Sequence, residues 1–224
     1  MNWKKEYLDV ILVPSGLCLV FGYHIFLIFR CIRCPQTTVI GYENHFRLAW
    51  VVRMLQTDAK NRGIPLQVIS STITAATSLA SISLALSSLI GTLVGSSLTH
   101  ILQSPFIYGD TRPTIISIKH ISLLICFLVA FASFIQCVRC LVHSNFLISM
   151  PNNDIPVTYV QRELIRGGLF WCIGLRAIYF ATNLLLWIFG PIPMFVSSVV
   201  MVVVLYFLDT NSTPLHQFQS AHLL

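Results

Sequence analysis

Long apolar runs separated by short polar stretches dominate this chain. Three of the runs are long enough to cross a bilayer as a helix, because about 20 residues at about 1.5 Å each span its hydrocarbon core. These runs are Leu8 to Phe29, Val68 to Leu93 and Ile115 to Val138. The pattern predicts an all-α fold, a multi-pass transmembrane helical bundle.

The last apolar region, Gly168 to Leu208, is too long for one helix. It is interrupted by Gly190-Pro191-Ile192-Pro193, where the prolines break the helical hydrogen-bond ladder. We therefore expect two helices here. The second, Met194 to Leu208, is short for a complete crossing, so the sequence favours five spans and leaves four as the alternative.

Composition agrees with a membrane protein, since 55% of the 224 residues are hydrophobic and only 10% are charged. We expect one transmembrane domain, residues 1–210, and a short polar tail, residues 211–224. The net charge of +6 comes from cations that flank the apolar runs. This placement indicates contact with anionic lipid headgroups at the cytoplasmic face, and no basic face with interleaved aromatic residues indicates nucleic acid.

The positions of the cations predict the orientation of the chain. Two connections, between the first and second spans and between the third and fourth, carry nine cations: Arg30, Arg33, Arg47, Arg53, Lys60, Arg62, Arg139, Arg162 and Arg166. The other side has four, Lys4, Lys5, Arg112 and Lys119. The positive-inside rule places the nine in the cytoplasm and the N-terminus outside, in the plasma membrane or an endomembrane. Five spans put the Asn211-Ser212-Thr213 sequon in the cytoplasm, and four could expose it to the lumen.

The first basic connection, Tyr42 to Gly63, contains a helical pattern of its own. Phe46, Trp50 and Met54 recur at i, i+4 spacing, with the cations Arg47, Arg53, Lys60 and Arg62 around them. Such an amphipathic helix suits the membrane interface, with its cations toward the headgroups.

Several motifs together resemble one family of membrane proteins. Arg47, Trp50 and Met54 form an R-x-x-W-x-x-x-M pattern. Three further segments carry the likeness: Cys34 to Gly41, Gly174 to Phe180 and Trp187 to Pro191. The chain resembles the family known as domain of unknown function 599, and its plant branch most. The resemblance implies a multi-pass membrane protein and assigns no catalytic residue.

The second span carries a regular face of small and hydroxylated residues: Ser71, Thr74, Ser78, Ser81, Ala85, Ser88, Thr92 and Gly95. Leu79, Ile82, Leu86, Leu89 and Leu93 form a lipid-like face. Small residues let helices approach closely, so one interpretation is helix packing. The other is that the hydroxyls line a polar path.

Arg176 is the most informative residue of the fourth span, where Tyr179, Asn183 and Trp187 share its face. A guanidinium within an apolar segment should contact protein. All acidic residues lie in loops or near span ends, so we expect a neutral or external partner. The structural alternative is bonding to the second span's hydroxyls, to carbonyls near Gly190, or snorkelling. The functional alternative is an anion site formed by Arg176, Tyr179, Asn183, Ser78, Ser81 and Ser88.

Two cysteine pairs flank spans on the predicted cytoplasmic side. They are Cys31 with Cys34 and Cys137 with Cys140. Juxtamembrane thiols are candidate palmitoylation sites, whereas the wide separation of the pairs argues against zinc. They could also be simple apolar helix residues.

No catalytic, phosphate-binding or metal-binding motif accompanies these features, so we expect no cofactor and no metal. The sequence favours a non-enzymatic accessory or scaffold protein that forms a homo- or hetero-oligomer. The alternative is a small carrier or channel for an anionic or lipid-like solute, using Arg176 and the hydroxyl face of the second span.

Overall fold

The computed structural model describes residues 5–95, 112–150 and 155–215. These residues form six α-helices and two short 3-10 helices. The α-helices are α1 (Lys5–Arg33), α2 (Val39–Gln56), α3 (Gly63–Gly95), α4 (Pro113–Ser149), α5 (Val157–Phe189) and α6 (Pro191–Asp209), and the 3-10 helices are η1 (Pro35–Thr37) and η2 (Ala59–Asn61). Within this part of the chain, β pairing is limited to an isolated bridge between Thr38 and Thr210. The all-α prediction is confirmed.

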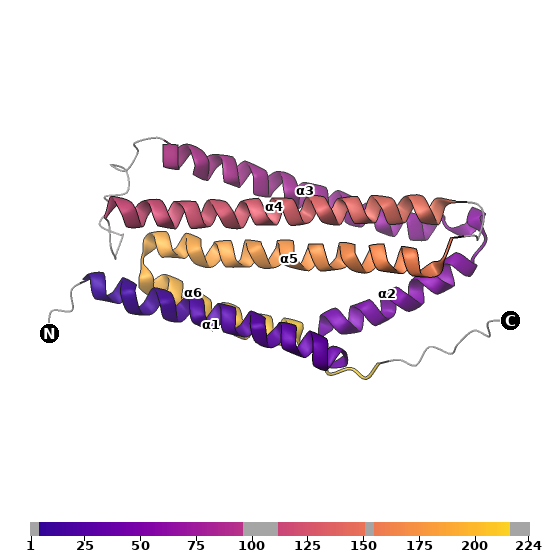
Figure 1. The fold of residues 1–224 in the computed structure, drawn as a ribbon, viewed down its shortest axis with the longest axis horizontal. Coiled ribbons are helices and arrows are strands. Elements are labelled where there is room, and N and C mark those ends of the chain that lie inside the picture. The colour runs from indigo at the N-terminus through magenta and orange to yellow at the C-terminus, as the bar shows by residue number, and fades with distance from the viewer. Residues whose placement is uncertain (1–4, 96–111, 151–154, 216–224) are drawn as a thin grey trace.

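The helices form an elongated bundle (Figure 1). α3, α4 and α5 run alongside one another, while α1 and α6 lie together beside the C-terminal half of α5. α2 runs obliquely from the end of α1 to the end of the bundle where α4 stops and α5 begins. We call this the α2 end.

Five helices of the described chain are long and apolar enough to cross a membrane, which confirms the favoured number of spans. The fourth and fifth are separated at Gly190, where φ is 150°, a value that favours glycine, and Pro191 begins α6. α4 and α5 extend beyond their apolar runs, to Ser149 and from Val157. These extensions of α4 and α5 are helical, contain polar residues and lie at the α2 end. Arg162 and Arg166 therefore lie within α5 and not in a loop.

Two different kinds of packing hold the bundle together. At the α2 end, large apolar side chains from α2, α3, α4 and α5 form one cluster, which includes Val51, Met54, Ile69, Leu141 and Leu164. Along α3, the face toward α4 carries small buried residues, namely Ala76, Ala80, Ser83 and Ser87. Small residues allow close approach of helix backbones. α3 makes its extensive contacts with α4 alone.

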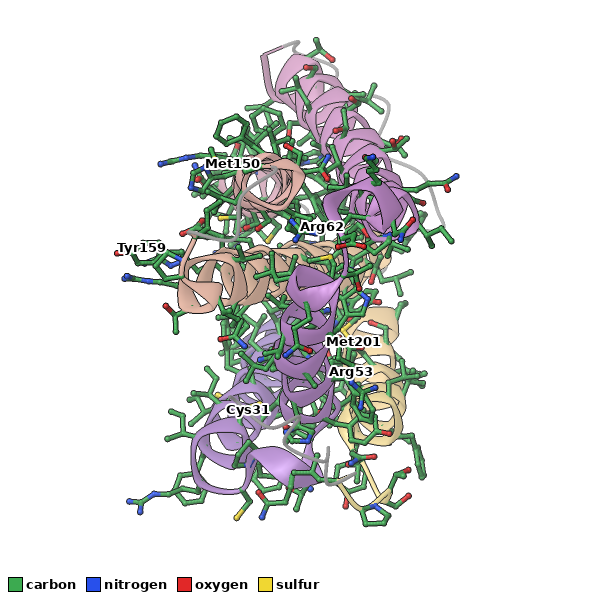
Figure 2. All side chains as sticks on the ribbon, turned by 90° about the vertical axis from the view of Figure 1, so that its right-hand side faces the viewer. Cys31, Arg53, Arg62, Met150, Tyr159 and Met201 are labelled. Atoms are coloured by element: carbon green, nitrogen blue, oxygen red, sulfur yellow. The ribbon has the colours of Figure 1, made fainter. Side chains whose placement is uncertain are left out.

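The connection after the first span contains the predicted helix, but its environment differs from the prediction. Val51 and Met54 of α2 are 0% and 4% exposed, so one face of α2 packs into the bundle. Among the cations expected to face headgroups, Arg62 is 3% exposed. Its guanidinium donates to carbonyl oxygens that end two helices: those of Leu55, Thr57, Ile148 and Met150, at 2.9 to 3.3 Å. Arg62 therefore binds the ends of α2 and α4 together. Both Arg62 and Met150 are labelled in Figure 2, where the α2 end of the bundle faces the viewer.

Candidate functional site

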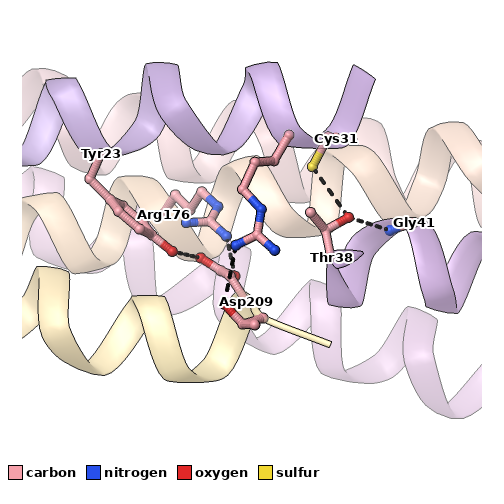
Figure 3. A network of polar contacts seen from close by, with 8 residues as sticks. Tyr23, Cys31, Thr38, Gly41, Arg176 and Asp209 are labelled. Carbon is pink, nitrogen blue, oxygen red and sulfur yellow. Dashed lines mark hydrogen bonds and ion pairs between the residues drawn. The ribbon is translucent and has the colours of Figure 1, made fainter. Parts of the chain in front are cut away.

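Arg176 lies in an ion pair that the sequence analysis excluded. Its Nη2 donates to Asp209 Oδ1 at 2.6 Å, and the two side chains are 18% and 12% exposed. The Tyr23 hydroxyl donates to the other carboxylate oxygen, Asp209 Oδ2, at 2.6 Å. This network, Tyr23–Asp209–Arg176, joins α1, α6 and α5 (Figure 3). The expected neutral or external partner is wrong, because the charge is compensated internally.

The partner was missed because Asp209 was assigned only to the end of a span. α5 and α6 are joined at Gly190, so positions at similar distances on either side of it return to similar depths. At about 1.5 Å per residue, Arg176 lies about 21 Å before Gly190 and Asp209 about 28 Å after it. A long arginine side chain can bridge this difference. Counting outward from Gly190 could have identified the pair.

A second set of contacts joins the end of α1 and η1 to the residues that follow α6. Arg30 donates from Nη1 to Thr210 Oγ1 at 3.3 Å and from Nη2 to the Thr37 carbonyl at 3.0 Å. The Asn211 backbone N–H donates to the same carbonyl at 2.9 Å. The sequon at Asn211 therefore lies at the same end of the bundle as the basic connection after α1, as five spans require.

The other residues predicted on the face of Arg176 do not form a site with it. Asn183 is buried and its Nδ2 contacts Met201 Sδ at 3.3 Å. Tyr179 is half-buried and lies outside the network. Trp187 donates from Nε1 to Asp9 Oδ1 at 3.0 Å, which ties the far end of α5 to α1. The shared face is used for contacts with α1 and α6.

The hydroxyl stripe of α3 also lies away from Arg176. Ser78, Ser81 and Ser88 are exposed, as are the other described stripe positions Ser71, Thr74, Ala85 and Thr92. The three serines donate to backbone carbonyls one turn earlier, those of Thr74, Thr77 and Leu84, at 3.0 to 3.1 Å. The predicted bonding of these hydroxyls to Arg176, and a cavity shared with it, are therefore wrong.

Two of the three R-x-x-W-x-x-x-M residues, Arg47 and Trp50, line a small cavity between α2, α3, α4 and α5. Its volume is about 220 Å³, and Arg47 and Trp50 line it with Gly167, Gly168 and Trp171. Arg47 donates to Glu43 Oε2 at 2.8 Å and lies over Gly168, where an added Cβ would be 2.2 Å from Nη1. Met54 lies in the adjoining core cluster. The motif thus docks α2 on α5.

The four candidate palmitoylation cysteines separate into two groups. Cys137 and Cys140 are buried in α4, so an acyl chain could reach them only if the helices separated. Cys34 is exposed, and the Cys31 thiol donates to Thr38 Oγ1 at 3.7 Å (Figure 3). Palmitoylation stays a prediction for Cys31 and Cys34. In the described ranges, no group of three or more histidine, cysteine or acidic side chains could hold a metal.

Arg176 also lines an apolar groove of about 600 Å³ between α1, α4 and α5. Its Nη1 is buried and has no hydrogen-bond partner among the described residues. An anion at this nitrogen would lie close to the Asp209 carboxylate, which would repel it. Anion binding at Arg176 stays a prediction that the ion pair makes less favourable.

Comparison with known proteins identifies a family for this chain. The family model described as "Protein of unknown function, DUF599" matches residues 11–214. No match was found among the curated proteins or the solved structures. The match covers the region of the predicted resemblance, including the R-x-x-W-x-x-x-M residues. It does not distinguish branches of the family, so the likeness to plant members stays a prediction.

Proposed function

The chain belongs to the DUF599 family of proteins of unknown function, and we propose that it is a non-enzymatic accessory membrane protein that assembles through α3. The observation that supports this proposal is that the stripe of small and hydroxylated residues on α3 is exposed. At about 100° per residue, the stripe lies opposite the face that packs on α4. α3 therefore carries a second small face that no described helix covers.

The packing of α3 inside the protein indicates what the exposed stripe can bind. Ala76, Ala80, Ser83 and Ser87 already accommodate one long helix, α4. The stripe has residues of the same size at the same spacing. The partner we propose is the stripe of a second copy, because two parallel α3 helices related by a two-fold axis place each small position against its own counterpart.

The carrier alternative receives less support. It needs the hydroxyl stripe and Arg176 to line one cavity, but the stripe is on the outer face of α3 and Arg176 is paired with Asp209 on the opposite side of α5 from α3. The stripe hydroxyls also donate to their own helix backbone. A single helix face of this kind forms a contact surface and not a path.

Two alanines of α3 give a matched test of the assembly. Ala85 lies in the stripe, whereas Ala75 is also exposed but lies on the lipid-like face. Ala85→Leu adds bulk where two stripes would meet, and Ala75→Leu adds the same bulk elsewhere. We expect the wild-type chain and Ala75→Leu to be dimers in lipid nanodiscs by mass photometry, and Ala85→Leu to dissociate about tenfold more readily. A monomeric wild type, or equal effects of the two variants, would reject the proposal.

A further inference from the structure

A basic cleft lies between α4 and α5 toward the α2 end. It has a volume of about 830 Å³, and its polar lining consists of Gln136, Arg139, His143, Glu163 and Arg166. Glu163 is the single carboxylate among them, and its Oε1 accepts from Arg166 Nη1 at 2.9 Å. Arg139 donates to a neutral partner, Gln136 Oε1, at 3.4 Å. The cleft therefore has one uncompensated positive charge, which favours an anion.

The cleft adjoins the apolar groove that lies between α1, α4 and α5. Leu169 and Ile173 of α5 line both, so the basic cleft continues into the groove along these two side chains. The groove extends along Ala177 and Phe180 of α5 and Val129 of α4. A polar, positively charged region is thus followed along the helix axis by an apolar channel open to the side. This order of surfaces is that of a lipid headgroup followed by its acyl chain.

The depth of the cleft agrees with a headgroup. At the opposite end of the bundle, Lys119 Nζ lies 5.4 Å from the ring centroid of Trp187, which places these residues of α4 and α5 at one level. Arg139 follows Lys119 by 20 residues, and Arg166 precedes Trp187 by 21. Both separations correspond to about 30 Å, the thickness of the hydrocarbon core. The two arginines are therefore separated from Lys119 and Trp187 by about the thickness of the hydrocarbon core, as is expected of groups that face opposite leaflets.

We propose that the cleft and groove bind an anionic phospholipid of the leaflet at the α2 end. Its phosphodiester lies between Arg139 and Arg166, and one acyl chain follows Leu169 and Ile173 into the groove. Guanidinium groups bind phosphate oxygens through charge-assisted hydrogen bonds. The single surplus charge of the cleft matches the single charge of a phosphodiester with a neutral headgroup. A soluble anion would leave the groove unused.

The test compares phosphatidylglycerol with phosphatidylcholine of the same acyl chains, titrated into the purified full chain in detergent and measured by native mass spectrometry. We expect the wild type to bind phosphatidylglycerol about tenfold more tightly. Arg139→Gln with Arg166→Gln should weaken this binding about 25-fold, or roughly fivefold for each arginine, and should abolish the preference. Arg162→Gln removes a cation of α5 that lies outside the cleft and should change affinity less than twofold.

Two further measurements keep the result interpretable. Arg139→Lys with Arg166→Lys keeps both charges and should retain the preference, even if the glutamine variant fails to fold. Ile173→Trp fills the junction between cleft and groove, so it should weaken long-chain phosphatidylglycerol several-fold and leave the dihexanoyl lipid unchanged. The proposal is overturned by equal wild-type affinity for the two lipids, by equal losses in the Arg162 and cleft variants, or by glycerol phosphate competing as strongly as the lipid.

Discussion

Arg166 and Arg176 lie ten residues apart on α5, and each forms an ion pair with a carboxylate. The two pairs differ in burial and in whether the carboxylate belongs to another helix. Arg176 pairs at 2.6 Å with Asp209 of α6, and both side chains are largely buried, at 18% and 12% exposed. Arg166 pairs at 2.9 Å with Glu163 of its own helix, and these side chains are 45% and 20% exposed. The deeper pair joins two helices, α5 and α6, and neutralises the arginine charge inside the protein. The outer pair leaves its arginine accessible beside a second cation, Arg139. Burial against other helices therefore separates the structural arginine from the accessible one.

The largest effect is expected at the deeper pair. Arg176→Met removes the ion-pair partner of the largely buried Asp209 carboxylate, which keeps its hydrogen bond from the Tyr23 hydroxyl, so we expect a loss of about 3 to 5 kcal/mol in the free energy of unfolding. Reversible unfolding in mixed micelles measures it. A loss below about 1 kcal/mol, comparable to that of an exposed pair, would show that the two pairs do not differ as described.

A third arginine, Arg62, tests how much a buried guanidinium contributes through its bonds to carbonyl oxygens at helix ends. Arg62→Met removes the donors to four carbonyl oxygens at the ends of α2 and α4, and we expect a loss of about 2 to 3 kcal/mol. Lys60→Met, at an exposed position nearby, is the control and should change stability by less than about 0.5 kcal/mol. Hydrogen exchange should increase at the ends of α2 and α4; uniform exchange along the bundle would contradict the local role.

Two glycines of α5 differ in what lies against them. A Cβ at Gly174 would lie 2.8 Å from ring atoms of the buried Phe134, so Gly174→Ala should cost about 1 to 3 kcal/mol. At Gly168 the atom in the way is the end of the flexible Arg47 side chain. Gly168→Ala should therefore cost less than about 1 kcal/mol. Thermal unfolding of both variants measures the difference, and a reversed order would mean that Phe134 moves more easily than Arg47.

The smallest effect on stability is expected at the outer pair. Arg166→Gln should change the free energy of unfolding by less than about 1 kcal/mol, because an exposed pair within one helix contributes little. High salt should reduce this loss in the free energy of unfolding further, because salt screens exposed ion pairs. Unfolding at low and high ionic strength tests this, and a salt-independent loss of several kcal/mol would place Arg166 among the structural arginines.

Much of the fold follows from the sequence because membrane spans depend on local properties. Run length identified the spans, and Gly190-Pro191 marked the break between α5 and α6. The i, i+4 pattern of Phe46, Trp50 and Met54 identified α2. These features require no knowledge of which helices meet.

The errors concern contacts between helices. The orientation of the α3 stripe could not be deduced, because small residues suit both an internal contact and a lipid-facing surface, and both surroundings are apolar. The Arg176 partner required knowing that Asp209 returns to the same depth. Arg62 could not be distinguished by pattern from exposed neighbours such as Lys60, since its burial depends on where α4 ends.

Arg176 and Asp209 neutralise each other inside the bundle, and the strength of this interaction can be measured directly. A double-mutant cycle of Arg176→Met and Asp209→Leu, measured by reversible unfolding in the same micelles, isolates their interaction. We predict a coupling energy of about 2 to 3 kcal/mol, with the double variant more stable than either single one. Additive losses with a coupling near zero would contradict the internal pair and return Arg176 to the role of a site for an external anion.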